Sequence, residues 1–191
     1  MPFDTPALEL RTDLLVIRPQ LLDDNAADYR AVMANREWLR RWSGSPWPAD
    51  TFTLEDNRED LIGHIDDHRA RTALGFSIAT RVGIEILGSI YVQEIDDWLD
   101  EYAATDETRR AIAGAQARVD LWTRLDSQPD LLENVVTSAA SWFAHEWNLK
   151  AIWRSRLDCP ELERAYALAG MRHVARLTNP ETGRVQLLYR L

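Results

Sequence analysis

Two histidines and one cysteine are the residues whose types most directly suggest metal or nucleophile chemistry. His64 and His68 lie four residues apart in a stretch with helical periodicity, a spacing that metal sites use. No third histidine or cysteine lies nearby, so the preferred interpretation is a pair of exposed helical histidines beside Asp66 and Asp67, and we expect no metal. Cys159 has no evident histidine partner, which disfavours a catalytic thiolate.

Acidic and aromatic residues form the second group of candidates. Glu85 and Asp120 lie in runs with strand character, where the alternation of side chains points each acid either to a site or to solvent. The acidic run 96–107 predicts a solvated surface or, alternatively, a surface that attracts a basic acceptor. Tyr166 precedes Gly170 by four residues at the end of a predicted helix, where its ring either packs on a sheet or faces a site.

Seven short runs of strand character must position these residues. Arg81-Val82-Gly83 joins two of the runs into an antiparallel hairpin, and a turn around Asn179-Pro180 and Gly183 joins the last two. The predicted strands are residues 14–18, 73–80, 84–93, 118–125, 151–157, 171–178 and 185–191.

Helical patterns fill the segments between these strands. Asp24 is a candidate cap for the first helix, and Thr53 with Asp56 resembles a capping box at the start of the second. Residues 131–147 carry apolar side chains four apart on one face, and the last helix starts at Pro160 and stops at Gly170. The tryptophan-rich segment 38–47 ends among helix breakers, so we predict a connection there.

Hairpins and strand–helix–strand units are mixed along the chain. This order predicts an α/β (α+β) fold, with a mixed sheet and helices packed on both of its faces. The segment 94–116 combines an acidic stretch with a small-residue helix near 108–116, and we interpret it as an insertion. Residues 1–191 are therefore expected to form one domain with an insertion at about 94–116.

Composition narrows the function classes. The net charge of -9 argues against wholesale binding to nucleic acid or to an anionic membrane. One cysteine excludes an intramolecular disulfide, and neither a signal peptide nor a membrane-length apolar run is evident. We therefore expect a cytoplasmic protein.

Several short motifs occur in a characteristic order along the chain. They are Ile17-Arg18-Pro19; Asn35, Arg36, Leu39, Trp42, Pro46 and Trp47; Gly88-Ser89-Ile90; Leu121-Trp122; and Tyr166 with Gly170. Their order resembles the GNAT superfamily of acyl-CoA-dependent N-acyltransferases, especially the branch that acetylates the N-termini of ribosomal proteins. The resemblance implies a GNAT-like, mostly antiparallel sheet of about seven strands.

The resemblance also implies an activity and a set of site residues. Acetyl-CoA is the implied donor, and a primary amine, such as a protein N-terminus, is the implied acceptor. Tyr166 is the implied general acid, and Asp120 is the candidate base, with Glu85 as its alternative. The implied cofactor-binding residues are Leu121, Trp122, Thr123, Arg124, Ser127, Gln128, Asp130, Leu131 and Cys159. The implied acceptor-binding residues are Trp42, Trp47 and Glu85.

The segment 126–133 departs from the family pattern at the loop that binds the pyrophosphate of CoA. GNAT loops usually carry Arg or Gln followed by two spaced glycines, because glycine lets backbone N–H groups approach phosphate oxygens closely. Here Asp126 replaces the basic residue, and Ser127 and Pro129 replace the glycines. Cys159 stands where the family often has Asn, and Asp120 stands where this branch usually has a small residue.

Three functions follow from these observations. The first is an acyl-CoA N-acyltransferase, the second is a GNAT-fold pseudo-enzyme that has lost CoA binding and serves as a binding or oligomerisation module, and the third is an unrelated α/β binding domain. The retained Tyr166 favours the first, and the acidic loop favours the second. The expected partners are acyl-CoA and an amine or peptide N-terminus, with no nucleic acid or membrane, and a homodimer is left open.

Overall fold

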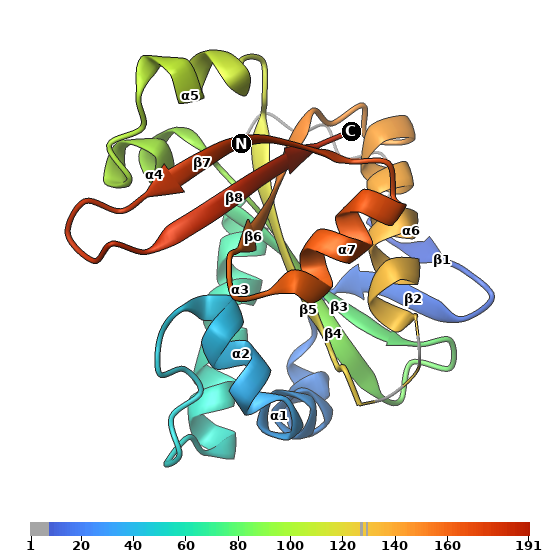
Figure 1. The fold of residues 1–191 in the computed structure, drawn as a ribbon. Helices are drawn as coiled ribbons and strands as arrows, with labels where there is room; N and C mark the ends of the chain where they lie inside the picture. Colours follow the sequence, from blue (N-terminus) through green and yellow to red (C-terminus); the bar gives the residue numbers. More distant parts are fainter. Residues whose placement is uncertain (1–7, 127, 129) are drawn as a thin grey trace.

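A mixed eight-stranded sheet organises the chain in the computed structural model, which describes residues 8–126, 128 and 130–191 (Figure 1). The strand order is β1-β2-β3-β4-β5-β6-β8-β7, and every neighbouring pair except β5–β6 is antiparallel. The strands are β1 (Leu10–Arg11), β2 (Leu15–Pro19), β3 (Ala73–Thr80), β4 (Ile86–Gln93), β5 (Ala117–Thr123), β6 (Ala151–Arg156), β7 (Arg172–Thr178) and β8 (Val185–Arg190). The predicted mixed, mostly antiparallel sheet is confirmed, with the two-residue β1 as an addition.

Helices cover both faces of this sheet. The helices are η1 (Leu22–Asp24), α1 (Asn25–Ala34), α2 (Arg36–Ser43), α3 (Leu54–Ala70), α4 (Asp96–Glu101), α5 (Asp106–Ala111), α6 (Leu131–His145) and α7 (Pro160–Leu168). On the α6 and α7 face, Phe143 of α6 and Tyr166 of α7 both pack their rings against Trp153 of β6. On the opposite face, α3 approaches β3 closely enough that a Cβ on Gly75 would lie 3.5 Å from the Cβ of His64.

Periodic patterns in the sequence predicted most of these elements. The capping box at Thr53 and Asp56 is present, and α7 starts at Pro160 and is followed by Gly170 at a positive φ of 80°. Asp24 precedes α1 as predicted but makes no side-chain cap; its carboxylate instead pairs with Arg18 at 2.7 Å.

The prediction of a connection at residues 38–47 is wrong, because most of it belongs to α2. Trp38 and Leu39 form the buried side of this helix, and Gly44 ends it in a left-handed conformation with φ of 66°. Trp38 and Trp42 are therefore part of a helix that packs on the core, whereas Trp47 lies in the segment after it.

The predicted insertion contains α4 and α5, which lie beside β7 and β8 (Figure 1). The second helix spans Asp106–Ala111 rather than the predicted 108–116. A small apolar cluster joins the insertion to the sheet. Its buried members are Ile95, Leu99, Tyr102, Ile112, Ile152, Leu177 and Leu188.

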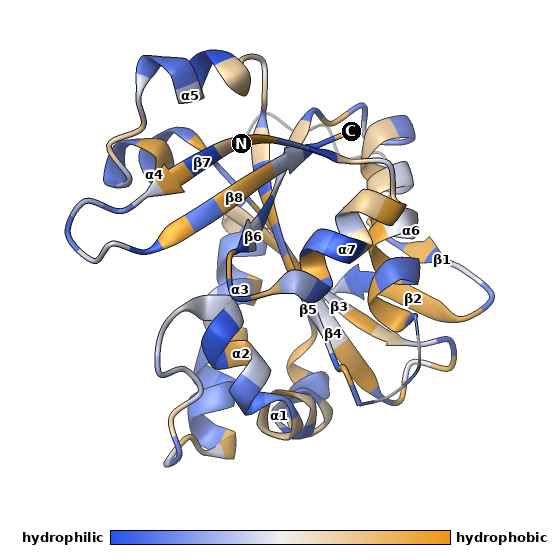
Figure 2. Ribbon diagram, in the orientation of Figure 1, coloured by the Kyte–Doolittle hydropathy of each residue, from blue (hydrophilic) through white to orange (hydrophobic). Residues whose placement is uncertain are grey.

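Hydrophobic residues line the interior strands, and polar residues cover the outer helices. Orange residues concentrate along β2 and on the inner strands, whereas the outward turns of α5 are mostly blue (Figure 2). In the part of the chain that the structure describes, no helix is both long and apolar enough to cross a membrane.

The parallel pair β5–β6 is the feature that creates a site. These strands pair only from Ala117↔Ala151 to Val119↔Trp153. Beyond that point β5 continues to Thr123 and β6 continues to Arg156 without pairing to each other. The two strands therefore part inside the sheet, immediately after Val119 and Trp153.

Candidate active site

A buried ion-pair network occupies the point where β5 and β6 part. Asp120 and Arg154 are the first residues beyond the paired stretch, and the Arg154 Nε donates to Asp120 Oδ1. Arg118, two residues earlier on β5, donates its Nε to Asp120 Oδ2 at 2.7 Å. One carboxylate thus joins two guanidinium groups, and it bridges the two strands where their backbone pairing stops.

Further contacts fix both guanidinium groups. Arg154 Nη1 donates to Trp42 O and to Gln186 Oε1, each at 3.2 Å, and its guanidinium lies 5.0 Å from the centre of the Trp42 ring. Arg118 donates to Gln93 Oε1, and its guanidinium lies 4.5 Å from the Trp98 ring. Cation–π contacts and side-chain hydrogen bonds therefore hold the pair in one geometry.

Asp120 is ionised in this setting. Burial alone raises the pKa of the Asp120 carboxyl, but the charges of Arg118 and Arg154 outweigh burial and bring the pKa below its ordinary value. Both carboxylate oxygens already accept a guanidinium N–H. A carboxylate with this pKa and these contacts is a weak proton acceptor, which disfavours the base role expected from the sequence.

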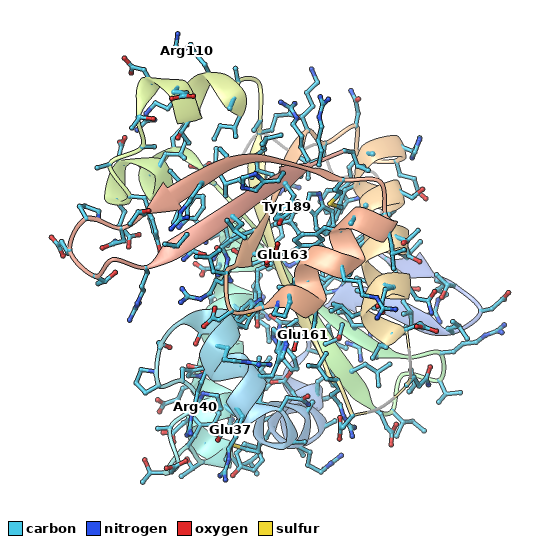
Figure 3. All side chains as sticks on the ribbon, in the orientation of Figure 1. Glu37, Arg40, Arg110, Glu161, Glu163 and Tyr189 are labelled. Carbon is cyan, nitrogen blue, oxygen red and sulfur yellow. The ribbon has the colours of Figure 1, made fainter. Side chains whose placement is uncertain are left out.

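Tyr166 reaches the same point from the other face of the sheet. Its hydroxyl donates to the backbone oxygen of Arg154 at 2.8 Å, which places the phenol where the strands separate. The ring is fully buried, and burial raises the pKa of the Tyr166 hydroxyl. Its neighbour Tyr189 donates to Glu163 of α7 at 3.0 Å, and Figure 3 shows this pair between β8 and α7.

A cavity of about 510 Å³ opens on the face of the ion-pair network. Its walls come from α2 and the segment after it (Trp42, Trp47), from α3 (His64), from β4 (Tyr91) and from the insertion (Trp98, Tyr102). Arg118, Asp120 and Arg154 line its buried end. The cavity therefore joins the insertion, the helices and the parting strands in one site.

The predicted acceptor residues divide into two groups. Trp42 and Trp47 line the cavity as a site role requires. Glu85 does not, because it is exposed in the turn before β4, whereas Tyr91 and Gln93 at the other end of that strand line the cavity. The structure therefore does not bring Glu85 to the site that holds Asp120.

The predicted cofactor residues on β5 pair with β4 on one side, whereas on the other side the pairing of β5 with β6 has already ended at Val119. Arg124 donates its backbone N–H to Leu87 O of the β4 side at 2.7 Å. Because hydrogen-bonding directions alternate along a strand, the N–H groups of Leu121 and Thr123 face away from β4, toward the gap beside β6. Trp122 is buried between them with its side chain on the cavity face.

The loop that follows β5 is acidic and partly self-paired. Arg124 makes two hydrogen bonds to Asp126, at 3.0 and 3.1 Å, and this pairing lowers the pKa of Asp126. Gln128 is exposed, and Asp130 has a left-handed backbone with φ of 64° directly before α6. Ser127 and Pro129 lie outside the described residues.

Leu131 and Cys159 are buried at the starts of α6 and α7. Burial raises the pKa of the Cys159 thiol to about 12, which keeps it protonated at neutral pH. Cys159 therefore lies near the gap as a small neutral group rather than as a thiolate.

His64 is a cavity residue that sequence reasoning did not assign. Its ring lies 4.9 Å from the Tyr91 ring, and burial lowers the pKa of its imidazole. His68, by contrast, bonds the backbone oxygen of Gly75 through Nδ1 at 3.1 Å. The two histidines were predicted to be exposed, but both are half-buried, because His64 packs against Tyr91 and His68 against Phe76. Only His64 lines the cavity.

Sequence reasoning also did not assign Arg118, Arg154 or Trp98 to this cavity. Arg118 and Asp120 are two residues apart on one strand, so the sequence already indicated that they share a face. Nothing local in the sequence indicates that Arg154 or Trp98 meets them, because that contact depends on the register of β5 with β6 and on the path of the insertion.

Comparisons with known proteins place this architecture. No protein-family model matches the chain, and a search of curated proteins finds no match. Solved structures do match. A ribosomal-protein-S5-alanine acetyltransferase from Vibrio fischeri has a TM-score of 0.70 at 15% identity and covers 96% of this chain and 95% of its own.

Two further structures give similar values. The microcin C7 self-immunity acetyltransferase MccE, in complex with acetyl-CoA and AMP, has a TM-score of 0.68 at 14% identity and covers 93% of this chain and 92% of its own. An acetyltransferase of the GNAT family from Bacillus anthracis has a TM-score of 0.67 at 12% identity and covers 96% of this chain and 97% of its own. The chain therefore has the fold of the GNAT acetyltransferases, as its motifs implied.

Proposed function

We propose that this protein is an acyl-CoA-dependent N-acyltransferase that uses acetyl-CoA to acylate a primary amine. The observation that carries the proposal is the parting of β5 and β6 after Val119 and Trp153, with the Tyr166 hydroxyl at the point of separation. A cavity of about 510 Å³ adjoins that point on the other face. An acetyl-CoA complex of the similarly folded MccE supports the choice of donor.

The residues on the donor side suit a thioester. The N–H groups of Leu121 and Thr123 face the gap, where they have the direction needed to donate to a thioester oxygen. Leu131 begins a fifteen-residue helix, and the free N–H groups of a helix start attract phosphate oxygens. Arg124 lies between these two features and supplies the nearest basic group along the chain.

The reaction forms a C–N bond, breaks a C–S bond and requires two proton transfers. The amine nitrogen attacks the thioester carbon, and the developing oxyanion accepts hydrogen bonds from the edge of β5. When the C–S bond breaks, Tyr166 gives its phenolic proton to the thiolate. The amine loses a proton to a base in the cavity, and the phenol is restored from solvent.

The base in this proposal is His64, whose imidazole lines the cavity. Its lowered pKa keeps the imidazole neutral at pH 7, so an unprotonated ring nitrogen is available to accept the proton. Asp120 lacks that capacity while Arg118 and Arg154 occupy its oxygens. We therefore assign Asp120 to holding the two arginines and His64 to accepting the proton.

A specific observation also favours the second candidate, a GNAT-fold binding module without CoA. Arg124 donates two hydrogen bonds to Asp126, so the acidic loop neutralises the basic group nearest to it. A carboxylate at the loop also repels a pyrophosphate. The two functions differ in whether CoA thiol is released.

Release of free CoA from acetyl-CoA, followed with a thiol reagent in the presence of a panel of primary amines, tests the proposal. Amine-dependent release supports an acyltransferase. Release that no amine stimulates, from protein that does bind the amines, supports the binding module instead.

A further inference from the structure

The buried end of the cavity carries an excess of positive charge. Arg118 and Arg154 share the single carboxylate of Asp120, so this group of three has a net charge of +1. The other acids that line the described cavity, Asp60 and Glu101, are exposed at its mouth. Charge is therefore segregated, with the positive excess inside and the acids near solvent.

Each guanidinium keeps one terminal nitrogen without a partner among the described residues. Arg154 uses Nε and Nη1 for Asp120, Trp42 and Gln186, which leaves Nη2. Arg118 uses Nε and Nη2 for Asp120 and Gln93, which leaves Nη1. The Arg154 side chain is only 9% exposed, so its remaining donor has no other outlet than the cavity that it lines.

Fixed, unpaired guanidinium donors at the end of a cavity recognise an oxyanion. Arginine binds carboxylates through parallel N–H donors, and donors already held in place lose little entropy on binding. A ligand carboxylate here neutralises the +1 excess that Asp120 leaves. We propose that this group binds a carboxylate of the acyl acceptor, so that the acceptor is a small amino-acid-like molecule; this inference rests on the proposed function.

The strand geometry sets how far the carboxylate lies from the reacting amine. Arg118 and Asp120 project from one face of β5, about 7 Å apart along the strand. The N–H of Leu121, which faces the gap, follows directly after Asp120. A carboxylate held by the arginines therefore places a nitrogen a few bonds away near the thioester, as an α-amino acid does.

The walls favour a compact acceptor with an apolar body. Trp42, Trp47 and Trp98 offer aromatic surface for such a body. The cavity volume of about 510 Å³ is within the range of small-molecule sites. Asp60 and Glu101 at the mouth repel a second carboxylate, so acceptors with one carboxylate are preferred over acidic peptides.

Binding without acetyl-CoA provides the test. The twenty standard L-amino acids are screened by thermal shift, and the tightest is compared by calorimetry with its amide and with its decarboxylated amine. The acid is expected to bind about 10- to 100-fold more tightly than either, which is the usual effect of hydrogen bonds to a charged group. Arg118→Gln is expected to bring the ratio of acid to amide affinity close to one.

Arg69→Gln serves as the matched control, because Arg69 is exposed on α3 and pairs only at the surface with Asp66. It should leave the ratio unchanged. An amide that binds as tightly as its acid overturns the inference, and so does a screen in which no amino acid binds at millimolar concentration. The comparison of acid and amide uses the wild-type chain, so it stands even if Arg118→Gln folds poorly.

Failure of this inference is distinguishable from failure of the proposed function. If acids bind in preference to amides but no CoA is released from acetyl-CoA, the carboxylate site stands and the acyltransferase proposal falls. If decarboxylated amines are acetylated as fast as the acids, the acyltransferase stands and the carboxylate site falls.

Discussion

Tyr166 is the proposed general acid of the chemical step. Its hydroxyl lies at the parting of the strands but donates to the Arg154 backbone oxygen, and burial raises its pKa. A phenol with a raised pKa stays protonated at neutral pH, which is the state that a proton donor requires. The hydrogen bond to the Arg154 backbone oxygen holds the hydroxyl at the point where the strands part.

Tyr166→Phe is expected to lower kcat about 100-fold, because a positioned general acid contributes at least that much. The dissociation constant for acetyl-CoA should stay unchanged. Loss of the buried hydrogen bond should also lower the free energy of unfolding by about 1 kcal/mol. Steady-state rates and urea denaturation measure these effects, and an unchanged kcat rules out the acid role.

The proposed base role of His64 leads to a prediction for the pH dependence of the reaction. Burial lowers the pKa of its imidazole below the ordinary 6.5, so the neutral, proton-accepting form prevails above that lowered value and is lost as the pH falls through it. The rate constant kcat/KM should therefore decline on the acidic side with an apparent pKa below 6.5.

His64→Gln should remove this acidic limb and lower kcat/KM at pH 8 about 100-fold. His68→Gln is the control, because His68 bonds Gly75 and does not line the cavity. The assignment fails if the acidic limb persists in His64→Gln.

Gly88 allows β4 to pack closely against β5 and so keeps the edge of β5 in place. A Cβ at this position would lie 2.1 Å from Trp122 O and 2.8 Å from Thr123 Cα, both of which are backbone atoms. Because backbone cannot move aside cheaply, Gly88→Ala must displace β5 next to the N–H groups that face the gap.

Gly88→Ala should lower the free energy of unfolding by about 2 to 3 kcal/mol and reduce turnover. Gly63→Ala, in the middle of α3, adds a Cβ that meets no heavy atom within 4 Å apart from its chain neighbours and the backbone of its own helix, and it should instead raise the free energy of unfolding by about 0.5 to 1 kcal/mol. Thermal or urea unfolding compares the two. Equal stability of the two variants contradicts the close packing of β4 on β5.

Asp28 is a buried acid at the junction of α1 and α3, and its effect on the free energy of unfolding depends on pH. Asp28 accepts from Asn57 at 3.0 Å, but its other oxygen has no partner among the described residues. Burial, the largest effect, raises the pKa of Asp28 from 3.8 to about 6. A group whose pKa is higher in the folded than in the unfolded protein stabilises the fold at pH values below its unfolded pKa. Asp28 loses that contribution as the pH rises through 6.

Asp28→Asn removes this titration while keeping the shape of the side chain. It should raise the free energy of unfolding at pH 7.5 by about 3 kcal/mol at most, and the gain should shrink as the pH approaches 4. Urea denaturation at several pH values measures this dependence. A gain of the same size at every pH would show that Asp28 does not titrate with folding.

Elements with a regular period were predictable from the sequence, and elements defined by tertiary contacts were not. The apolar residues four apart predicted α6, and the alternating runs around Gly83 predicted the β3–β4 hairpin. The helix α2 escaped prediction because Gly44 and two prolines follow its tryptophans closely. The strand β1 has only two residues, too few for a period, and exists through its pairing with β2.

Motifs and single acidic residues predicted part of the candidate site, including Asp120, which lines the cavity. Tyr166, Trp42 and Trp47 lie at the strand parting or in the cavity, as their motifs implied. The network of Asp120 with Arg154 joins residues 34 positions apart through the β5–β6 register, which no local pattern encodes. Glu85 does not reach the cavity because it immediately precedes β4, and the opposite end of that strand lines the cavity.

The molecule as a whole combines the fold of known acetyltransferases with an acidic loop after β5. The fold supplies parted strands, a helix start and a cavity on the opposite face. The loop supplies Asp126, which pairs with Arg124. Whether the backbone donors outweigh the acidic side chains decides between an acyltransferase and a binding module.

Calorimetric titration of the purified protein with acetyl-CoA tests this balance most directly. The acyltransferase proposal predicts saturable binding of one acetyl-CoA per chain, with a dissociation constant below about 1 mM, the upper range of enzyme KM values. Absence of binding at millimolar acetyl-CoA, from protein whose cooperative unfolding shows that it is folded, would contradict it.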